Sequence, residues 1–99
     1  MDTSTVVARL REHEEELKAA GIEHLALHGS YARGTPTNEA SDVDVIADFD
    51  RTSKQTLIGR AHLENRLSDI LGLKADLSDR KMLRPEVLER AVRESVLVF

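Results

Sequence analysis

Segments with helical periodicity alternate with short apolar segments along this chain, and that alternation restricts its fold more than any other feature. Residues 4–20 place apolar side chains three and four positions apart, as on one face of a helix, and Gly21 follows where a helix would end. Residues 22–28 and 43–49 are short and largely apolar, and residues 74–78 predict a third, very short strand. This alternation favours an α/β or α+β fold in which helices cover a small sheet.

A second long helix is expected after residues 43–49. Thr52 or Ser53 can cap its start, and it is expected to end near Leu71, because Gly72 suits the left-handed position that follows a helix. The side chains expected to face inward are Val6, Leu10, His13, Leu17 and Ala20 from the first helix, and Leu57, Ile58, Ala61, Leu67, Ile70 and Leu71 from the second.

The length of the chain, 99 residues, suits one compact domain, residues 1–99, with a single modest core. Residues 35–38 have turn composition, and Pro85 suits the first turn of a final short helix. Residues 96–99 would close the chain as a last strand or as an extension of that helix. A domain this small is expected to leave one wall of a substrate cleft to a partner chain, and apolar residues of 96–99 are candidates for that contact.

The composition disfavours several classes of partner and site. The net charge is −4 and the basic residues are scattered, which argues against direct binding of nucleic acid. Aromatic residues make up only 3% of the chain, too few for a base-stacking platform. There is no cysteine for a disulfide or a thiolate metal site, and the histidines are too dispersed for a zinc site. Because no apolar stretch is long enough for a signal peptide or a membrane span, a cytoplasmic protein is expected.

Asp42 and Asp44 are the first candidate functional residues. Their spacing of two places both side chains on one face of a strand, while Val43, Val45 and Ala47 face the other side. Two ionised carboxylates so close repel each other unless a cation lies between them, so the pair predicts a Mg²⁺ site. Taken alone, the same spacing also fits a pair of solvated acids at the start of a strand.

Asp76 lies between apolar residues, where an isolated charge would be costly to bury. If its strand neighbours that of Asp42, the three carboxylates form a cluster that can hold two metal ions. The alternative is that Asp76 ends an edge strand beside Lys74.

Gly29, Ser30, Arg33 and Gly34 form a small-residue turn just before the two aspartates. Such a turn lets backbone N–H groups approach a phosphate closely. Ser30 adds a hydroxyl group, and Arg33 could neutralise charge on a triphosphate or a leaving pyrophosphate. A phosphate cradle followed by a carboxylate pair is what nucleotidyl transfer requires.

Together, the sequences Gly-Ser-Tyr-Ala-Arg-Gly at 29–34, Ser-Asp-Val-Asp-Val at 41–45 and Lys-Ala-Asp-Leu at 74–77 resemble the minimal nucleotidyltransferases of the DNA polymerase β superfamily. These proteins are known chiefly as MNT antitoxins paired with HEPN-domain ribonuclease toxins. The resemblance implies a small mixed sheet flanked by helices. It also implies that Asp42, Asp44 and Asp76 are the catalytic residues that bind Mg²⁺ in a two-ion site. Gly29 and Ser30 would hold the phosphates of ATP.

The activity that the resemblance implies is transfer of AMP from ATP to a tyrosine hydroxyl of a cognate HEPN toxin, with which the chain would form a hetero-oligomer. Two alternatives stay open. One is a catalytically silent antitoxin that covers the toxin, and the other is a nucleotidyltransferase acting on a small molecule. The second usually needs a further acceptor domain, for which few residues remain after Asp76.

Two positions depart from the family pattern. His28 stands where an aromatic residue is frequent, and Tyr31 stands where an arginine is common. The second change would remove one cation near the triphosphate, which would either weaken ATP binding or leave Arg33 to act alone. Neither change affects an expected metal ligand, so activity is still expected.

Overall fold

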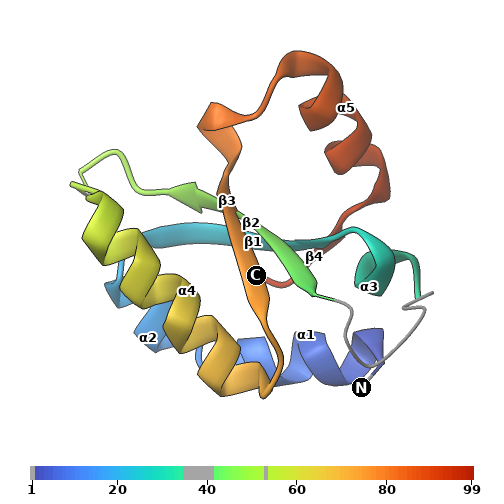
Figure 1. Ribbon diagram of the computed structural model, residues 1–99, viewed down its shortest axis with the longest axis horizontal. Helices are drawn as coiled ribbons and strands as arrows, with labels where there is room; N and C mark the ends of the chain where they lie inside the picture. The colour runs from blue at the N-terminus through green and yellow to red at the C-terminus, as the bar shows by residue number, and fades with distance from the viewer. Residues whose placement is uncertain (1, 35–41, 53) are drawn as a thin grey trace.

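The computed structural model describes residues 2–34, 42–52 and 54–99, and it contains one four-stranded sheet of order β3-β2-β1-β4 (Figure 1). Strand β1 runs antiparallel to β2 and to β4, whereas β2 and β3 are parallel. The elements are α1 (Thr3–Glu12), α2 (Glu14–Ala19), β1 (Ile22–His28), α3 (Ser30–Arg33), β2 (Val43–Phe49), α4 (Leu57–Leu71), β3 (Ala75–Asp79), a short 3-10 turn η1 (Arg80–Met82), α5 (Pro85–Glu94) and β4 (Val96–Leu97). The predicted small mixed sheet flanked by helices is confirmed.

The helices are distributed unequally over the two faces of the sheet. Helices α1, α2 and α4 cover one face, and α5 lies on the opposite side (Figure 1). The covered face is buried because alternate strand residues such as Leu25, Leu27 and Val45 point into it. Asp44 and Asp48 alternate with those residues and are half-buried on the other face. The polar face of the sheet is therefore the one on which a site can form.

The first predicted helix is interrupted at His13. Its backbone leaves the helical region at φ −108° and ψ 19°, so α1 ends at Glu12 and α2 begins at Glu14. The predicted inward stripe is otherwise confirmed at Val6, Leu10 and Leu17, which are fully buried, but Ala20 is exposed.

The predicted start of the second long helix was wrong. Thr56, not Thr52, caps α4, since its hydroxyl group accepts a hydrogen bond from the N–H of Gly59. Thr52 belongs instead to a turn in which its N–H and hydroxyl donate to Asp50, and the alternative cap Ser53 lies outside the described residues. The predicted end is confirmed, because Gly72 follows the helix at φ +69°.

The inward face of α4 also differs from the prediction at its first turn. Leu57 and Ile58 are 86% and 73% exposed, and Ala61 is exposed too. The buried positions are spaced four residues apart, at Leu63, Leu67 and Leu71. Because the helix begins later than predicted, its first turn is solvent-exposed instead of packing inward. The two leucines expected at the end of the stripe, Leu67 and Leu71, are confirmed, and Ile70 is half-buried.

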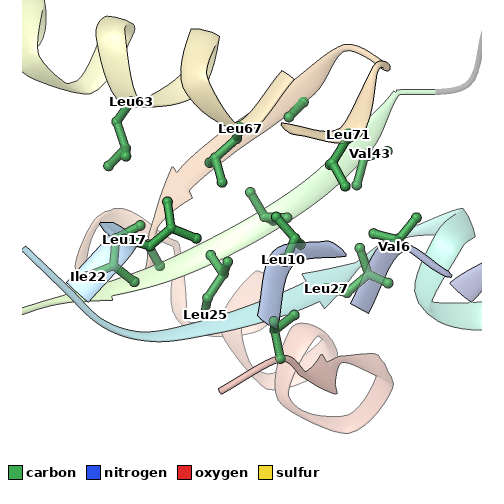
Figure 2. Packing of buried hydrophobic residues seen from close by; sticks show 14 of the residues in the cluster. Val6, Leu10, Leu17, Ile22, Leu25, Leu27, Val43, Leu63, Leu67 and Leu71 are labelled. Carbon is green, nitrogen blue, oxygen red and sulfur yellow. The ribbon is translucent and has the colours of Figure 1, made fainter. Parts of the chain in front are cut away.

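The core is built almost entirely from aliphatic side chains between the sheet and the three helices that cover it. Figure 2 shows side chains from α1, α2, α4 and the strands meeting there. Its labelled members are Val6, Leu10, Leu17, Ile22, Leu25, Leu27, Val43, Leu63, Leu67 and Leu71.

Leu67→Ala is expected to destabilise the protein by about 2–5 kcal/mol, because a fully buried leucine loses its contacts and leaves a cavity. A loss of that size is a large fraction of the roughly 5–15 kcal/mol that stabilises a typical domain. Urea unfolding measures it. Leu57→Ala on the same helix is the matched control, and a similar loss there would contradict the exposure of that residue.

A surface ion pair joins α2 to α4. Arg66 donates from Nε to Glu16 Oε2 at 2.5 Å and from its terminal nitrogen to Glu16 Oε1 at 2.9 Å. These hydrogen bonds lower the pKa of Glu16 to about 2.

The Glu16–Arg66 pair is expected to make stability depend on pH. Because the pKa of Glu16 falls from 4.5 in the unfolded chain to about 2, the stabilisation is complete above pH 4.5 and is lost as the pH falls towards 2. Glu16→Gln should therefore lower the urea midpoint at pH 7, and the difference from wild type should shrink between pH 4.5 and 2. Glu15→Gln, at an exposed position on the same helix, is the control. A difference that stays constant with pH would contradict the assignment.

The end of the chain is a strand, as one of the two alternatives predicted. Val96 pairs with Leu27, and beyond β4 the N–H of Val98 donates to the carbonyl of Leu25 at 2.8 Å. The expectation that residues 96–99 offer an apolar contact surface was wrong for Val98, which is buried. Leu97 is 61% exposed, and Val96 and Phe99 are half-buried and pack partly against the core. The segment completes the sheet because its backbone groups pair with β1.

Within the described parts of the chain, no helix combines the length and the apolar character needed to cross a membrane.

Candidate functional site

Three carboxylates predicted from the sequence lie at one end of the open face of the sheet. Asp44 and Asp76 are register partners, because β2 and β3 run parallel. Asp42 precedes β2, and its carboxyl group lies close enough to that of Asp76 to raise the pKa of Asp76. The strand that carries Asp76 therefore neighbours the strand that follows Asp42 and carries Asp44, as the predicted three-carboxylate cluster requires.

The electrostatics of this cluster oppose its full ionisation. Partial burial raises the pKa of Asp76 above its usual range, and the negative charge of Asp42 raises it further. Burial likewise raises the pKa of Asp44, an effect that Asp42 strengthens and that the nearby His28 and Arg33 oppose. Lys74 lies 3.9 Å from Asp42 but is largely exposed. The cluster therefore favours a proton or a cation among its oxygens.

The donor set suits a hard divalent cation such as Mg²⁺, which prefers carboxylate oxygens. The negative charge of Asp42 opposes ionisation of Asp76, and a cation bound beside both carboxylates would offset that repulsion. Within residues 2–34, 42–52 and 54–99, no three acidic, histidine or cysteine side chains already converge as a finished metal site. The residues present thus fit the ion by the chemistry of their oxygens and by the register that pairs Asp44 with Asp76.

Gly29 connects β1 to α3 in a conformation that only glycine adopts readily. Its φ is +74° and its ψ is −150°. A Cβ atom built on Gly29 would lie 2.5 Å from Oδ2 of Asp44. The absence of a side chain therefore lets the turn approach the Asp44 carboxylate closely, which brings the backbone of the turn to the edge of the carboxylate cluster.

Ser30 and Arg33 are the first and last residues of the single turn α3. The carbonyl of Gly29 accepts from the N–H groups of Ala32 and Arg33, and Gly34 ends the turn at φ +72°. Arg33 lies 3.6 Å from the carboxylate of Glu94 at the end of α5, and both side chains are partly exposed. The expected phosphate ligands thus lie on the short segment next to Asp44, and their role stays a prediction.

Tyr31 belongs to the core and does not face the site. Its side chain is only 3% exposed, and its carbonyl accepts a hydrogen bond from the hydroxyl of Thr3. The side chain at this position therefore packs in the core of this chain, and whether Tyr31 replaces a phosphate-binding cation stays a prediction.

His28 faces Asp44 directly across the β1–β2 pair. Its Nδ1 atom is buried and has no hydrogen-bond partner among the described residues. The charge that His28 can carry lowers the pKa of Asp44. The only histidine that the sequence places next to the glycine turn therefore lies beside the carboxylates.

Two residues of α4 that the sequence analysis did not single out accept hydrogen bonds from the backbone of β3. Glu64 Oε2 accepts from the N–H of Leu77 at 2.8 Å, and Ser68 Oγ accepts from the N–H of Ala75 at 2.9 Å. Both come from α4, and they satisfy the backbone donors on either side of Asp76. Their spacing of four residues on a helix is the only available signal, and it becomes informative only once α4 is known to lie along β3.

Comparison with known proteins places these features in context. The model of the nucleotidyltransferase domain family matches residues 10–98. Protein adenylyltransferase MntA of Thermococcus cleftensis is 34% identical over 90 residues, which cover 90% of this chain and 88% of that protein.

Two solved structures resemble this chain. One, described as a candidate minimal nucleotidyltransferase, superimposes with a TM-score of 0.78 at 34% identity and covers 97% of this chain and 95% of its own. The other is the complex of a tri-AMPylated Shewanella oneidensis HEPN toxin with its MNT antitoxin. It aligns with a TM-score of 0.64 at 18% identity over 91% of this chain and 70% of the other, which shows the shared fold.

Proposed function

Because the chain belongs to the nucleotidyltransferase domain family, we propose that it transfers AMP from ATP to a hydroxyl group of a partner protein. The partner that we propose is a HEPN-domain toxin, and the acceptor is a tyrosine hydroxyl, so that the chain acts as an antitoxin in a cytoplasmic hetero-oligomer. Similarity to a protein adenylyltransferase along most of both chains supports the reaction, and the fold shared with an MNT antitoxin supports the partner.

The observation that carries the proposal is the register of β2 and β3. It places Asp44 beside Asp76, next to the turn at Gly29 and Ser30. Adenylyl transfer needs negative groups that gather cations around the α-phosphate and a turn that receives the other phosphates. Both are brought to the same edge of the open sheet face by strand pairing.

In the proposed reaction the tyrosine oxygen forms a bond to the α-phosphorus, and the bond from that phosphorus to the oxygen bridging to the β-phosphate breaks. Pyrophosphate leaves with the electron pair of that bond. The raised pKa of Asp76 makes its carboxylate a better acceptor for the hydroxyl proton. Mg²⁺ held by Asp42, Asp44 and Asp76 would supply the positive charge that neutralises the phosphate oxygens.

The remaining residues of the site would bind and orient ATP. The N–H and hydroxyl groups of Ser30 can donate to phosphate oxygens, and Gly29 keeps the approach open. Arg33 would exchange its exposed contact with Glu94 for the phosphates, since an exposed ion pair is weak. Catalysis then rests on positioning and charge neutralisation, with no covalent enzyme intermediate.

Incubation of a candidate HEPN-domain toxin with the chain, ATP and Mg²⁺ tests the proposal. We expect intact-mass spectrometry to show the HEPN protein heavier by whole AMP units. Chelation of the divalent cation should abolish the gain, and peptide mapping should locate it on tyrosine. Tight binding without any gain in mass would refute the enzymatic proposal and favour an antitoxin that acts by covering the toxin.

A further inference from the structure

A cavity of about 200 Å³ lies between α5 and the open face of the sheet, apart from the carboxylate cluster. Figure 1 shows α5 on the side of the sheet opposite to α1, α2 and α4. Ala91 is the one residue of α5 that is buried. The apolar residues that line the cavity are Leu25, Ala26, Ile46, Leu88, Ala91, Val92 and Leu97.

The cavity continues the face that bears the carboxylates. Ile46 follows Asp44 by two residues on the same side of β2, and Ala26 precedes His28 by two residues on β1. One such step is about 7 Å along a strand. The ion pair between Glu94 and Arg33 ties the end of α5 to the expected phosphate-binding turn. A ligand that begins at Asp44 can therefore extend along the sheet beneath α5.

We propose that this cavity binds the purine base of the nucleotide, an inference that rests on the proposed adenylyl transfer. Its volume exceeds the roughly 150 Å³ of an apolar cavity that holds benzene, so a flat two-ring base is of suitable size. Ile46 is 9% exposed and lies on the sheet side, and the side chains of Leu88 and Val92 lie on the helix side. A base between these layers would bury apolar surface on both of its faces.

The distance between the ring and the reacting atom favours a nucleotide base over the acceptor tyrosine as the occupant of the cavity. A ribose separates the base of a nucleotide from its α-phosphate, so a base beside Ile46 leaves that phosphate near Asp44. The hydroxyl of a tyrosine is attached to its ring directly. A tyrosine ring seated in the cavity would hold its oxygen among apolar side chains and away from Asp76.

The polar groups at the edge of the cavity supply a basis for base selectivity. Asp48 lies on β2 two residues beyond Ile46, is half-buried and lines the cavity together with His24 and Arg80. Its carboxylate accepts hydrogen bonds, so it suits the exocyclic amino group of adenine and disfavours the carbonyl oxygen at the same position of guanine. Asp48 thereby becomes a specificity-determining residue for ATP over GTP.

The test measures affinities of the whole chain, with Mg²⁺, for two probes by calorimetry. The probes are an ATP analogue with a methylene bridge between its α- and β-phosphates, and inorganic tripolyphosphate, which lacks the base. Ala91→Leu fills the cavity and is expected to weaken binding of the analogue about tenfold, the loss of one well-packed contact. Tripolyphosphate binding should be unchanged, which also shows that the variant is folded.

Val87→Leu on the same helix is the matched control, since Val87 does not line the cavity, and it should leave both affinities unchanged. Val92→Ala trims an exposed part of the lining, so it carries little risk to folding. It should weaken binding of the analogue by a few-fold.

Asp48→Asn should reduce the preference for ATP over GTP in the corresponding analogues, an effect that a purely structural role of Asp48 would not produce.

The outcomes separate the two proposals. If the wild-type chain binds neither probe, the proposed function falls and this inference falls with it. If wild type binds the analogue but Ala91→Leu binds it equally well, the base lies elsewhere and only this inference is overturned. Unchanged nucleotide affinity with a raised KM for the partner protein would assign the cavity to the acceptor and would equally overturn it.

Discussion

Asp42→Asn combined with Asp44→Asn is expected to abolish AMP transfer while leaving partner binding intact. The carboxylates are expected to gather the positive charge that stabilises the transferring phosphate, a contribution of several kcal/mol. Each 1.36 kcal/mol corresponds to a factor of ten in rate, so the loss should be about 1,000-fold or greater. Single-turnover intact-mass kinetics with the HEPN partner measures it.

The double variant should fold at least as well as wild type. Asp42 and burial both raise the pKa of Asp44, so ionising this cluster costs stability, and neutral amides relieve that cost. The thermal midpoint at pH 7 is therefore expected to be unchanged or higher. Asp69→Asn, at an exposed position on α4, is the matched control and should retain activity. Full activity of the double variant would show that these carboxylates are not the catalytic ones.

Gly29→Ala is expected to reduce AMP transfer by about 100-fold or more, although it adds a single methyl group. The new Cβ would lie 2.5 Å from Oδ2 of Asp44, so the carboxylate or the turn must shift. A misplacement of about 1 Å in an active site can cost a factor of about 100 in rate. The backbone conformation, at φ +74°, adds strain of about 1–3 kcal/mol. Transfer rate and unfolding free energy should be measured on the same sample.

The variant Gly72→Ala distinguishes the effect of backbone strain from the effect of the steric contact with Asp44. Gly72 also has a positive φ, +69°, but a Cβ there would meet no atom within 4 Å. This variant should lose roughly 1–2 kcal/mol of stability, the cost of the left-handed backbone, and keep its transfer rate. If both variants lose activity in proportion to their stability, the contact between Gly29 and Asp44 has no special role in the reaction.

Local signals predicted the elements whose ends carry distinctive residues. Strands β1 and β2 have the predicted limits, Gly72 ends α4, and Pro85 begins α5. Glycine readily adopts the left-handed backbone that follows a helix, whereas proline fixes φ at a value that suits the first turn of one. The start of α4 was predicted less well. Thr52, Ser53 and Thr56 all have side chains that can cap a helix, and sequence periodicity does not choose among them.

The sequence did not show what lies on the two sides of β3 or above the open sheet face. Glu64 and Ser68 reach β3 only because α4 packs along it, and Glu94 reaches Arg33 only because α5 crosses the sheet. Asp48 lies near the end of β2, and only the packing of α5 over the sheet makes it part of a cavity. Contacts between residues far apart in the chain leave no periodic pattern in the sequence.

Local sequence patterns were enough to predict most of the helices and strands, the aliphatic character of the core and the candidate residues of the carboxylate cluster and the glycine turn. Spacings of two and of three or four follow from backbone geometry, so they can be read from the chain alone. The tertiary structure decided that Asp76 lies beside Asp44, that Tyr31 points into the core and that α5 forms a cavity with the sheet. These features depend on which strands pair and which helix faces they bury, and burial of apolar surface across the whole molecule sets that choice.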